Sequence, residues 1–103
     1  MEKTITSSEL AGLLAAGKQV RLLDVRRKED YDKSPDGIGE ARWYDPAAVA
    51  QWVHTLPAQQ EVVLYCVRGG SVSQSVQQTL AENGIEARYL EGGIEAYRKA
   101  SLK

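Results

Sequence analysis

The stretch "EVVLYC" at residues 61–66 constrains the fold more than any other part of the chain. After Glu61 it holds five consecutive apolar or aromatic residues. A strand with one face in water would alternate apolar and polar side chains, whereas a continuous apolar run is typical of a strand that is covered on both faces. We therefore predict that this run is an interior strand of a sheet with helices on both sides.

Strand-like and helix-like segments alternate along the rest of the chain. We expect strands at residues 4–6, 19–25, 41–44, 61–66 and within 86–93. Apolar residues recur at helical spacing in the segments between and after them. We expect helices at residues 8–17, 28–32, 46–56, 71–84 and 94–103.

Local signals suggest where some of these elements begin. Ser7 or Ser8 offers an N-cap for the first helix. Asp45 followed by Pro46 is a strong helix start, with a capping carboxylate before a proline at the first helical position. Turn chemistry is expected at residues 34–37, "SPDG".

The alternation predicts one α/β domain over residues 1–103. Short strand–helix–strand crossovers imply a mainly parallel central sheet of about five strands, with helices on both faces in a three-layer sandwich. A chain of 103 residues can bury a sufficient core without disulfides or metals.

Composition excludes several classes of function. The net charge is −1, and nothing in the chain resembles the basic face of a nucleic-acid or membrane partner. The start "MEKTITSSEL" lacks the apolar core of a signal peptide, so we expect a cytoplasmic protein. One cysteine and one histidine cannot form an internal disulfide or a structural zinc site, so no metal or cofactor is expected.

The segment "CVRGGS" carries the strongest functional signal. Cys66 ends the predicted strand at the sheet edge where ligands bind in parallel sheets. A tight loop containing Gly69 and Gly70 would direct backbone N–H groups at the sulfur and favour a nucleophilic thiolate. Ser71 would cap the next helix or donate its hydroxyl to an anion, and Arg68 would add a positive charge. The alternative is that Cys66 is only a small core hydrophobe.

Three stretches together resemble single-domain rhodaneses. "YCVRGGS" is similar to the family's active loop, "LLDVRRKEDYD" to its aspartate–valine–arginine segment, and "YLEGGIEAYRKA" to its C-terminal signature, with Tyr97 where tryptophan is frequent. The resemblance implies a rhodanese-like fold with Cys66 as the catalytic nucleophile. It also implies that Asp24 and Arg26 support the site. The implied substrate-binding loop consists of Val67, Arg68, Gly69, Gly70 and Ser71.

Sulfur transfer is the activity that the resemblance implies. Cys66 would take a sulfane sulfur from thiosulfate or a persulfide donor, hold it as a persulfide, and pass it to cyanide or a thiol. The chain has no second cysteine, so the acceptor must be an outside molecule. Donor and acceptor are expected to be small molecules, and either could instead be a protein.

One position departs from the family pattern. Many rhodaneses carry a histidine in the segment that reads "DGIGEA" here, and Gly37 stands in its place.

His54 lies beside the apolar stripe of a predicted helix and is expected to be solvated. Residues 91–93, "EGG", are expected to form a structural turn, and Trp43 and Trp52 to lie in the core or at its rim. We expect Arg27, Lys28 and Arg42 to add positive electrostatic potential around the site, unless they form an ordinary solvated face.

Two alternatives to a thiosulfate sulfurtransferase remain open. Phosphatase loops of the cysteine type need an arginine after five intervening residues to clamp the oxyanion, and that position is Val72. We therefore expect negligible phosphatase activity. The second alternative is a persulfide carrier or redox-sensing interaction module with low turnover of its own.

Overall fold

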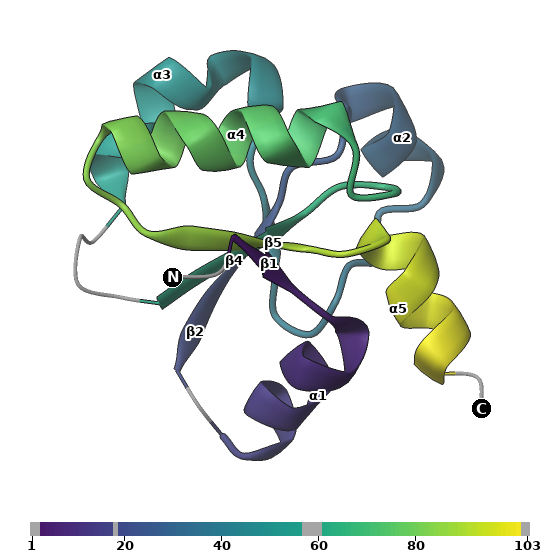
Figure 1. Ribbon diagram of the computed structural model, residues 1–103. Helices are drawn as coiled ribbons and strands as arrows, with labels where there is room; N and C mark the ends of the chain where they lie inside the picture. The colour runs from purple at the N-terminus through teal and green to yellow at the C-terminus, as the bar shows by residue number, and fades with distance from the viewer. Residues whose placement is uncertain (1–2, 18, 57–60, 102–103) are drawn as a thin grey trace.

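A computed structural model describes residues 3–17, 19–56 and 61–101 (Figure 1). Its centre is a five-stranded sheet with the order β1-β5-β4-β2-β3, in which every neighbouring pair is parallel. The strands are β1 Thr4–Ile5, β2 Val20–Asp24, β3 Arg42–Trp43, β4 Glu61–Tyr65 and β5 Ala87–Leu90. The prediction of an interior strand is confirmed, since β4 lies in the middle of the sheet.

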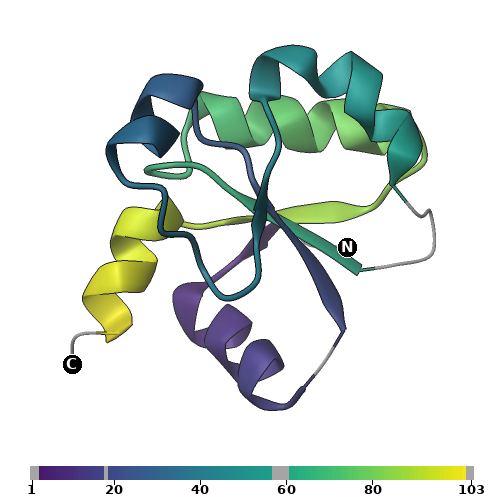
Figure 2. The ribbon, with the colours of Figure 1, turned by 180° about the vertical axis from the view of Figure 1, so that it is seen from behind.

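Helices cover both faces of the sheet, as predicted. Figures 1 and 2 show α1 (Ser7–Ala15) and α5 (Gly93–Ser101) on one side. On the other side lie α2 (Lys28–Lys33), α3 (Val49–Trp52) and α4 (Ser71–Glu82), with the short 3₁₀ turns η1 (Pro46–Ala48) and η2 (Val53–Thr55) flanking α3. In the described part of the chain, no helix is long and apolar enough to cross a membrane.

The side chains of β4 explain its continuous apolar sequence. Val62 and Leu64 belong to the core under α3 and α4, and Cys66 continues this side beyond the strand. Val63 and Tyr65 belong to the second core, under α1 and α5. Successive residues of a strand point to opposite faces, so a strand between two helical layers needs apolar residues at every position.

Two of the predicted boundary signals are wrong. The N-cap of α1 is Thr6, one residue before the predicted serines: its hydroxyl accepts a hydrogen bond from the Glu9 N–H at 3.1 Å, and its own N–H donates to Glu9 Oε1 at 3.0 Å. This reciprocal capping box needs a glutamate three residues after the cap, a spacing that Thr6 and Glu9 have.

The predicted turn at residues 34–37 is also displaced. A hydrogen-bonded turn forms instead from Ile38 to Ala41, whose N–H donates to the Ile38 carbonyl at 3.0 Å. The preceding residues are held by side chains from elsewhere, because Arg26 Nη1 donates to the Ser34 carbonyl at 2.8 Å and Arg98 Nη2 to the Asp36 carbonyl at 2.8 Å. These two carbonyls thus accept hydrogen bonds from arginine side chains, and residues 34–37 form no turn of their own.

The start of the third helical segment is confirmed in position. Asp45 Oδ1 accepts a hydrogen bond from the Ala47 N–H at 2.9 Å, and Pro46 is the first helical residue. The segment begins with a 3₁₀ turn and continues as α3. Because the following residues 53–56 pack Val53 and Leu56 into the core, this segment forms part of the layer that contains the site.

Candidate active site

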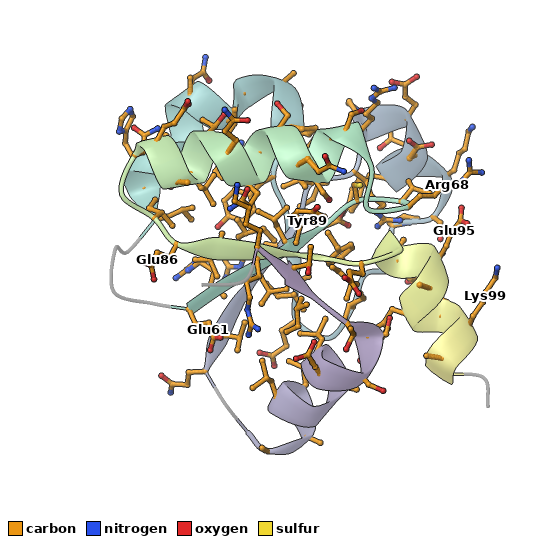
Figure 3. All side chains as sticks on the ribbon, in the orientation of Figure 1. Glu61, Arg68, Glu86, Tyr89, Glu95 and Lys99 are labelled. Carbon is orange, nitrogen blue, oxygen red and sulfur yellow. The ribbon has the colours of Figure 1, made fainter. Side chains whose placement is uncertain are left out.

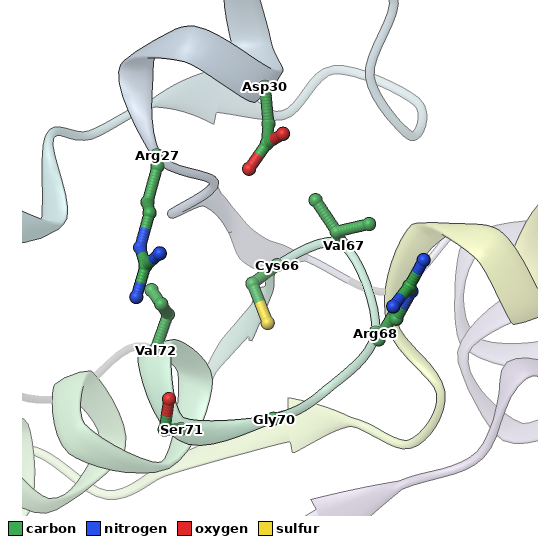
Figure 4. A pocket seen from close by; sticks show the side chains of 8 residues that line it. All are labelled: Arg27, Asp30, Cys66, Val67, Arg68, Gly70, Ser71 and Val72. Atoms are coloured by element: carbon green, nitrogen blue, oxygen red, sulfur yellow. The ribbon is translucent and has the colours of Figure 1, made fainter.

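Cys66 is the first residue after β4, at the carboxyl edge of the sheet. The residue is 6% exposed, and its sulfur points into the curve of the loop that follows (Figure 4). Residues 67–70 form that loop, and α4 begins at Ser71. The sulfur therefore lies within the curve of the backbone of residues 67–70.

The loop presents unpaired backbone donors around the sulfur. In the described part of the chain, none of the N–H groups of residues 67–70 donates to a protein acceptor. The first N–H groups of an α-helix also lack partners within the helix, and the helix dipole places partial positive charge there. The loop and the start of α4 thus form a region suited to negative charge on sulfur.

Ser71 does not cap α4, so the first of the two predicted roles of its hydroxyl is wrong, and donation to an anion stays a prediction. The N-cap is Gly70, for which no side-chain capping bond exists, and Ser71 is already the first helical residue. A cap must have non-helical backbone angles just before the helix, and Gly70 has them. The Ser71 hydroxyl lies in the pocket wall instead (Figure 4).

The "EGG" turn holds the loop in place. The carbonyls of Cys66 and Val67 accept hydrogen bonds from the N–H groups of Ile94 and Glu95 at 3.0 and 3.2 Å, at the start of α5. Gly69 has φ +72°, and a Cβ there would lie 2.8 Å from the Leu90 carbonyl oxygen. The turn is structural, as predicted, and its role is to pack backbone against backbone under the active loop.

An open pocket of about 460 Å³ lies over Cys66 (Figure 4). It is lined by Arg27, Asp30, Cys66, Val67, Arg68, Gly70, Ser71 and Val72. Four of the five predicted loop residues are in this wall, and the fifth, Gly69, faces the turn beneath it. The structure thus brings the loop together with α2, which is far away in the sequence.

The two arginines at the pocket differ in their partners. Arg68, with its side chain 80% exposed, pairs through Nε with Glu95 Oε2 at 3.2 Å and lies against α5 at the outer rim (Figures 3 and 4). Arg27 extends along the pocket wall toward Ser71, and it has no hydrogen-bond or ion-pair partner among the described residues. Of the two pocket arginines, Arg27 is therefore the one whose side chain has no partner among the described residues.

The other two cations expected near the site are engaged or distant. Lys28 pairs with Asp32 at 2.9 Å one turn along α2. Arg42 lines a different pocket, together with Leu14 and Gln19. Only Arg27 of the three lines the pocket at Cys66.

Asp30 is a pocket residue that was not predicted from the sequence. Its carboxylate points into the pocket (Figure 4), and no described residue pairs with it. The available signal was its spacing, because residues three apart on a helix lie on the same side. Arg27 and Asp30 have that spacing at the start of α2.

Asp24 and Arg26 form a buried ion pair that does not line the pocket. Arg26 Nη2 lies 2.6 Å from Asp24 Oδ2, and both side chains are almost inaccessible. Burial acts to lower the pKa of Arg26, but the hydrogen bond and charge of Asp24 outweigh it and raise that pKa. The pair joins the end of β2 to the segment around α2, because Arg26 Nη1 also donates to the Ser34 carbonyl at 2.8 Å. Arg27 and Asp30 lie in this same segment, and the predicted supporting role of the pair stays a prediction.

Tyr65 occupies the space beside Gly37, the residue that replaces the family histidine. A Cβ at Gly37 would lie 2.6 Å from the Tyr65 hydroxyl oxygen, which accepts a hydrogen bond from the Ile38 N–H at 3.1 Å. Burial raises the pKa of Tyr65 to about 12. The tyrosine thus anchors the loop before β3 without a side chain at residue 37.

The remaining predicted positions lie outside the pocket. His54 is exposed, as expected. Trp43 and Trp52 are half-buried, and Trp43 stacks on Tyr31 with ring centroids 5.1 Å apart. Across the described residues, no group of three or more histidine, cysteine or acidic side chains could hold a metal ion.

Comparisons with known proteins agree with this fold. A family model described as "Rhodanese-like domain" matches residues 6–100. A rhodanese-like domain protein from Staphylococcus aureus is 28% identical, with a TM-score of 0.83 and coverage of 94% of this chain and 91% of that one. A rhodanese homolog from the extremely thermophilic bacterium Thermus thermophilus is 32% identical, with a TM-score of 0.71 and coverage of 93% and 100%.

A shorter match connects the chain to much longer proteins. The tRNA 2-selenouridine synthase of Sulfurovum sp. (strain NBC37-1) is 42% identical over 52 residues, which are 50% of this chain and 14% of that protein. A homologous synthase from Shewanella sp. (strain ANA-3) is 46% identical over 48 residues, or 13% of its length. The chain thus matches about a seventh of the length of these curated relatives.

Proposed function

The chain belongs to the rhodanese-like domain family, and on that premise we propose that it is a sulfurtransferase whose Cys66 carries the transferred sulfur. The observation that supports this most directly is the position of the Cys66 sulfur inside a loop whose N–H groups, at residues 67–70, have no protein acceptor in the described chain. Such donors stabilise negative charge that develops on a sulfur bound there.

The proposed reaction has two steps. The Cys66 thiolate attacks the outer sulfur of thiosulfate, a Cys66–sulfur bond forms, the sulfur–sulfur bond of the donor breaks, and sulfite leaves with the bonding electrons. The enzyme then holds a persulfide anion, S–S⁻. Cyanide attacks its terminal sulfur and leaves as thiocyanate, which restores the thiolate; a thiol acceptor would leave as a persulfide. Ping-pong kinetics follow from this covalent intermediate.

Phosphate transfer is a weaker fit to the same pocket. Hydrolysis of a phosphate ester at a cysteine loop requires a bidentate arginine on the phosphoryl oxygens. The corresponding position is Val72, which lines the pocket with an apolar side chain. We expect the purified protein to show no Cys66-dependent hydrolysis of an aryl phosphate.

A persulfide carrier is the second candidate. The likeness to a short part of tRNA 2-selenouridine synthases supports it, because there the similar segment is a small fraction of a long protein. A carrier would receive sulfur from a protein donor and turn over small donors poorly. The pocket favours small donors, because its cysteine is 6% exposed and is reached through a cavity of about 460 Å³.

Intact-mass measurement tests the proposal. The protein is incubated with thiosulfate or with a small persulfide, and its mass is expected to rise by one sulfur atom in the wild type and not in Cys66→Ser. Cyanide should then remove that mass and release thiocyanate. Loading only from a protein persulfide would favour the carrier, and no loading from any donor would overturn sulfur transfer altogether.

A further inference from the structure

The pocket over Cys66 carries two unpaired charges of opposite sign. Arg27 and Asp30 both line it, and neither has a hydrogen-bond or ion-pair partner in its side chain among the described residues. Both come from the start of α2, and Figure 4 shows the two side chains directed into the same cavity from one side. The third charged residue of the wall, Arg68, is paired with Glu95 at the rim.

This distribution of charge discriminates between sulfur donors. Thiosulfate is a dianion, so Arg27 and the loop N–H groups would attract it, but Asp30 would repel it. A molecule with one carboxylate and one ammonium group would satisfy both side chains. Val67 and Val72 also line the pocket, and their apolar side chains suit a methylene rather than further charge.

We propose that the pocket selects a zwitterionic donor, the persulfide of an α-amino acid thiol such as cysteine persulfide. Arg27 binds the α-carboxylate, Asp30 binds the α-ammonium, and the outer sulfur of the donor meets Cys66. This assignment rests on the proposed sulfurtransferase function and identifies the class of its donor.

The transfer step balances without any further reactant. The Cys66 thiolate attacks the outer sulfur of R–S–SH, a bond forms between Cys66 Sγ and that outer sulfur, and the sulfur–sulfur bond of the donor breaks. The donor leaves as the thiolate R–S⁻ with the bonding electron pair, and the proton stays on the transferred sulfur. The loop N–H groups at residues 67–70, which have no acceptor among the described residues, would stabilise the resulting persulfide when it ionises.

Four donors separate the contributions of the two charges. Cysteine persulfide carries both groups, N-acetylcysteine persulfide lacks the ammonium, cysteamine persulfide lacks the carboxylate, and thiosulfate carries only negative charge. The rate of sulfur loading on Cys66 is followed by intact mass for each donor. The wild type is expected to load from cysteine persulfide about two- to fivefold faster than from either single-charge persulfide, as for partly exposed ion pairs.

Two variants then test the assignments. Asp30→Asn should abolish the preference for cysteine persulfide over its N-acetyl form and accelerate loading from thiosulfate, because the repelling carboxylate is gone. Arg27→Gln should abolish the preference over cysteamine persulfide and slow loading from thiosulfate. Glu29→Gln and Lys33→Gln are the matched controls, because each removes a charge of the same sign from a residue of α2 that does not line this pocket. Both should keep the wild-type ratios of loading rates between donors.

The outcomes distinguish this proposal from the one on which it rests. Loading by every donor with the same ratios in Asp30→Asn, Arg27→Gln and the wild type would overturn the zwitterion assignment and leave sulfur transfer intact. Faster wild-type loading from thiosulfate than from cysteine persulfide would do the same. Both proposals would be overturned by a wild type that loads neither from any of the four donors nor from a protein persulfide.

Discussion

Gly69 determines how closely the active loop approaches the rest of the protein. Its φ of +72° lies in the left-handed region, and a Cβ would meet the Leu90 carbonyl oxygen at 2.8 Å and the Gly92 nitrogen at 2.9 Å. All of these neighbours are backbone atoms of β5 and the turn after it, so none can move aside at low cost. A side chain at this position would therefore push the loop off the sheet edge.

We predict that Gly69→Ala destabilises the protein by about 1–3 kcal/mol, from backbone strain and the steric clash together. Urea unfolding measures this change. Sulfur loading of Cys66 should also fall, because the displaced loop no longer curves around the sulfur. Gly70→Ala is the matched control for stability: φ is −88° and nothing lies within 4 Å of a Cβ, so its unfolding free energy should change by less than about 1 kcal/mol.

Tyr65 makes stability depend on pH in the alkaline range. Burial raises its pKa from 10.0 to about 12 in the folded protein. Above pH 10 the unfolded chain loses the phenolic proton while the folded protein keeps it, so stability is full below pH 10 and falls as the pH rises toward 12. Tyr65→Phe should flatten this decline, as measured by urea unfolding at several pH values. An unchanged slope in Tyr65→Phe would contradict the assignment.

At the level of elements, α1 shows how a cap is chosen by a pair of residues rather than by one. Three hydroxyl residues stand in a row at its start, and only Thr6 is three positions before a glutamate. Thr6 and Glu9 exchange hydrogen bonds at 3.1 and 3.0 Å, and α1 then packs Leu10 into the core that it shares with α5. The cap therefore sets the residue at which the helix begins.

We predict that Thr6→Ala costs about 0.5–2 kcal/mol of stability, the usual range for loss of an N-cap. Thermal or urea unfolding would measure it. Ser8→Ala removes a hydroxyl from the first turn without touching the cap, so it should change stability by less than about 0.5 kcal/mol. A larger loss for Ser8→Ala than for Thr6→Ala would place the cap at the serine instead.

On the scale of the whole molecule, the pocket depends on a charge pair that a ligand would never touch. Asp24 and Arg26 are buried between the end of β2 and the segment from α2 to Ser34, and Arg26 also binds the Ser34 carbonyl at 2.8 Å. Trp43 of β3 donates to the Arg26 carbonyl at 2.9 Å. These contacts hold α2, with Arg27 and Asp30, over the loop that contains Cys66.

We predict that Asp24→Asn destabilises the protein by about 3–5 kcal/mol, because it leaves the Arg26 guanidinium buried without its counter-charge. Lys28→Gln breaks the ion pair between Lys28 and Asp32 within α2, whose side chains are 71% and 56% exposed. That change should cost no more than about 1 kcal/mol. Comparing the two by urea unfolding separates a buried brace from a surface pair, and similar losses in both would contradict the bracing role.

The sequence by itself determined the layered parallel sheet and the cysteine at its carboxyl edge. These features follow from short-range rules, namely the apolar run of β4, the alternation of strand and helix patterns, and the glycines after Cys66. Each can be evaluated within a window of a few residues. In the structure β2 and β4 are parallel neighbours, so the residues that follow β2 lie beside Cys66 at the same edge of the sheet.

Only the tertiary structure decided which side chains complete the site. The sequence predicted Arg68 in the substrate-binding loop and Arg27 only in the positive field around the site. In the structure, Glu95 of α5 holds Arg68 at the rim, while Arg27 is unpaired in the pocket among the residues that the structure describes. Asp30 enters the same wall, and the Tyr65 hydroxyl fills the space that Gly37 leaves. The physical reason is that a side chain's direction and partners depend on residues tens of positions away, and those residues become neighbours only when the helices pack on the sheet.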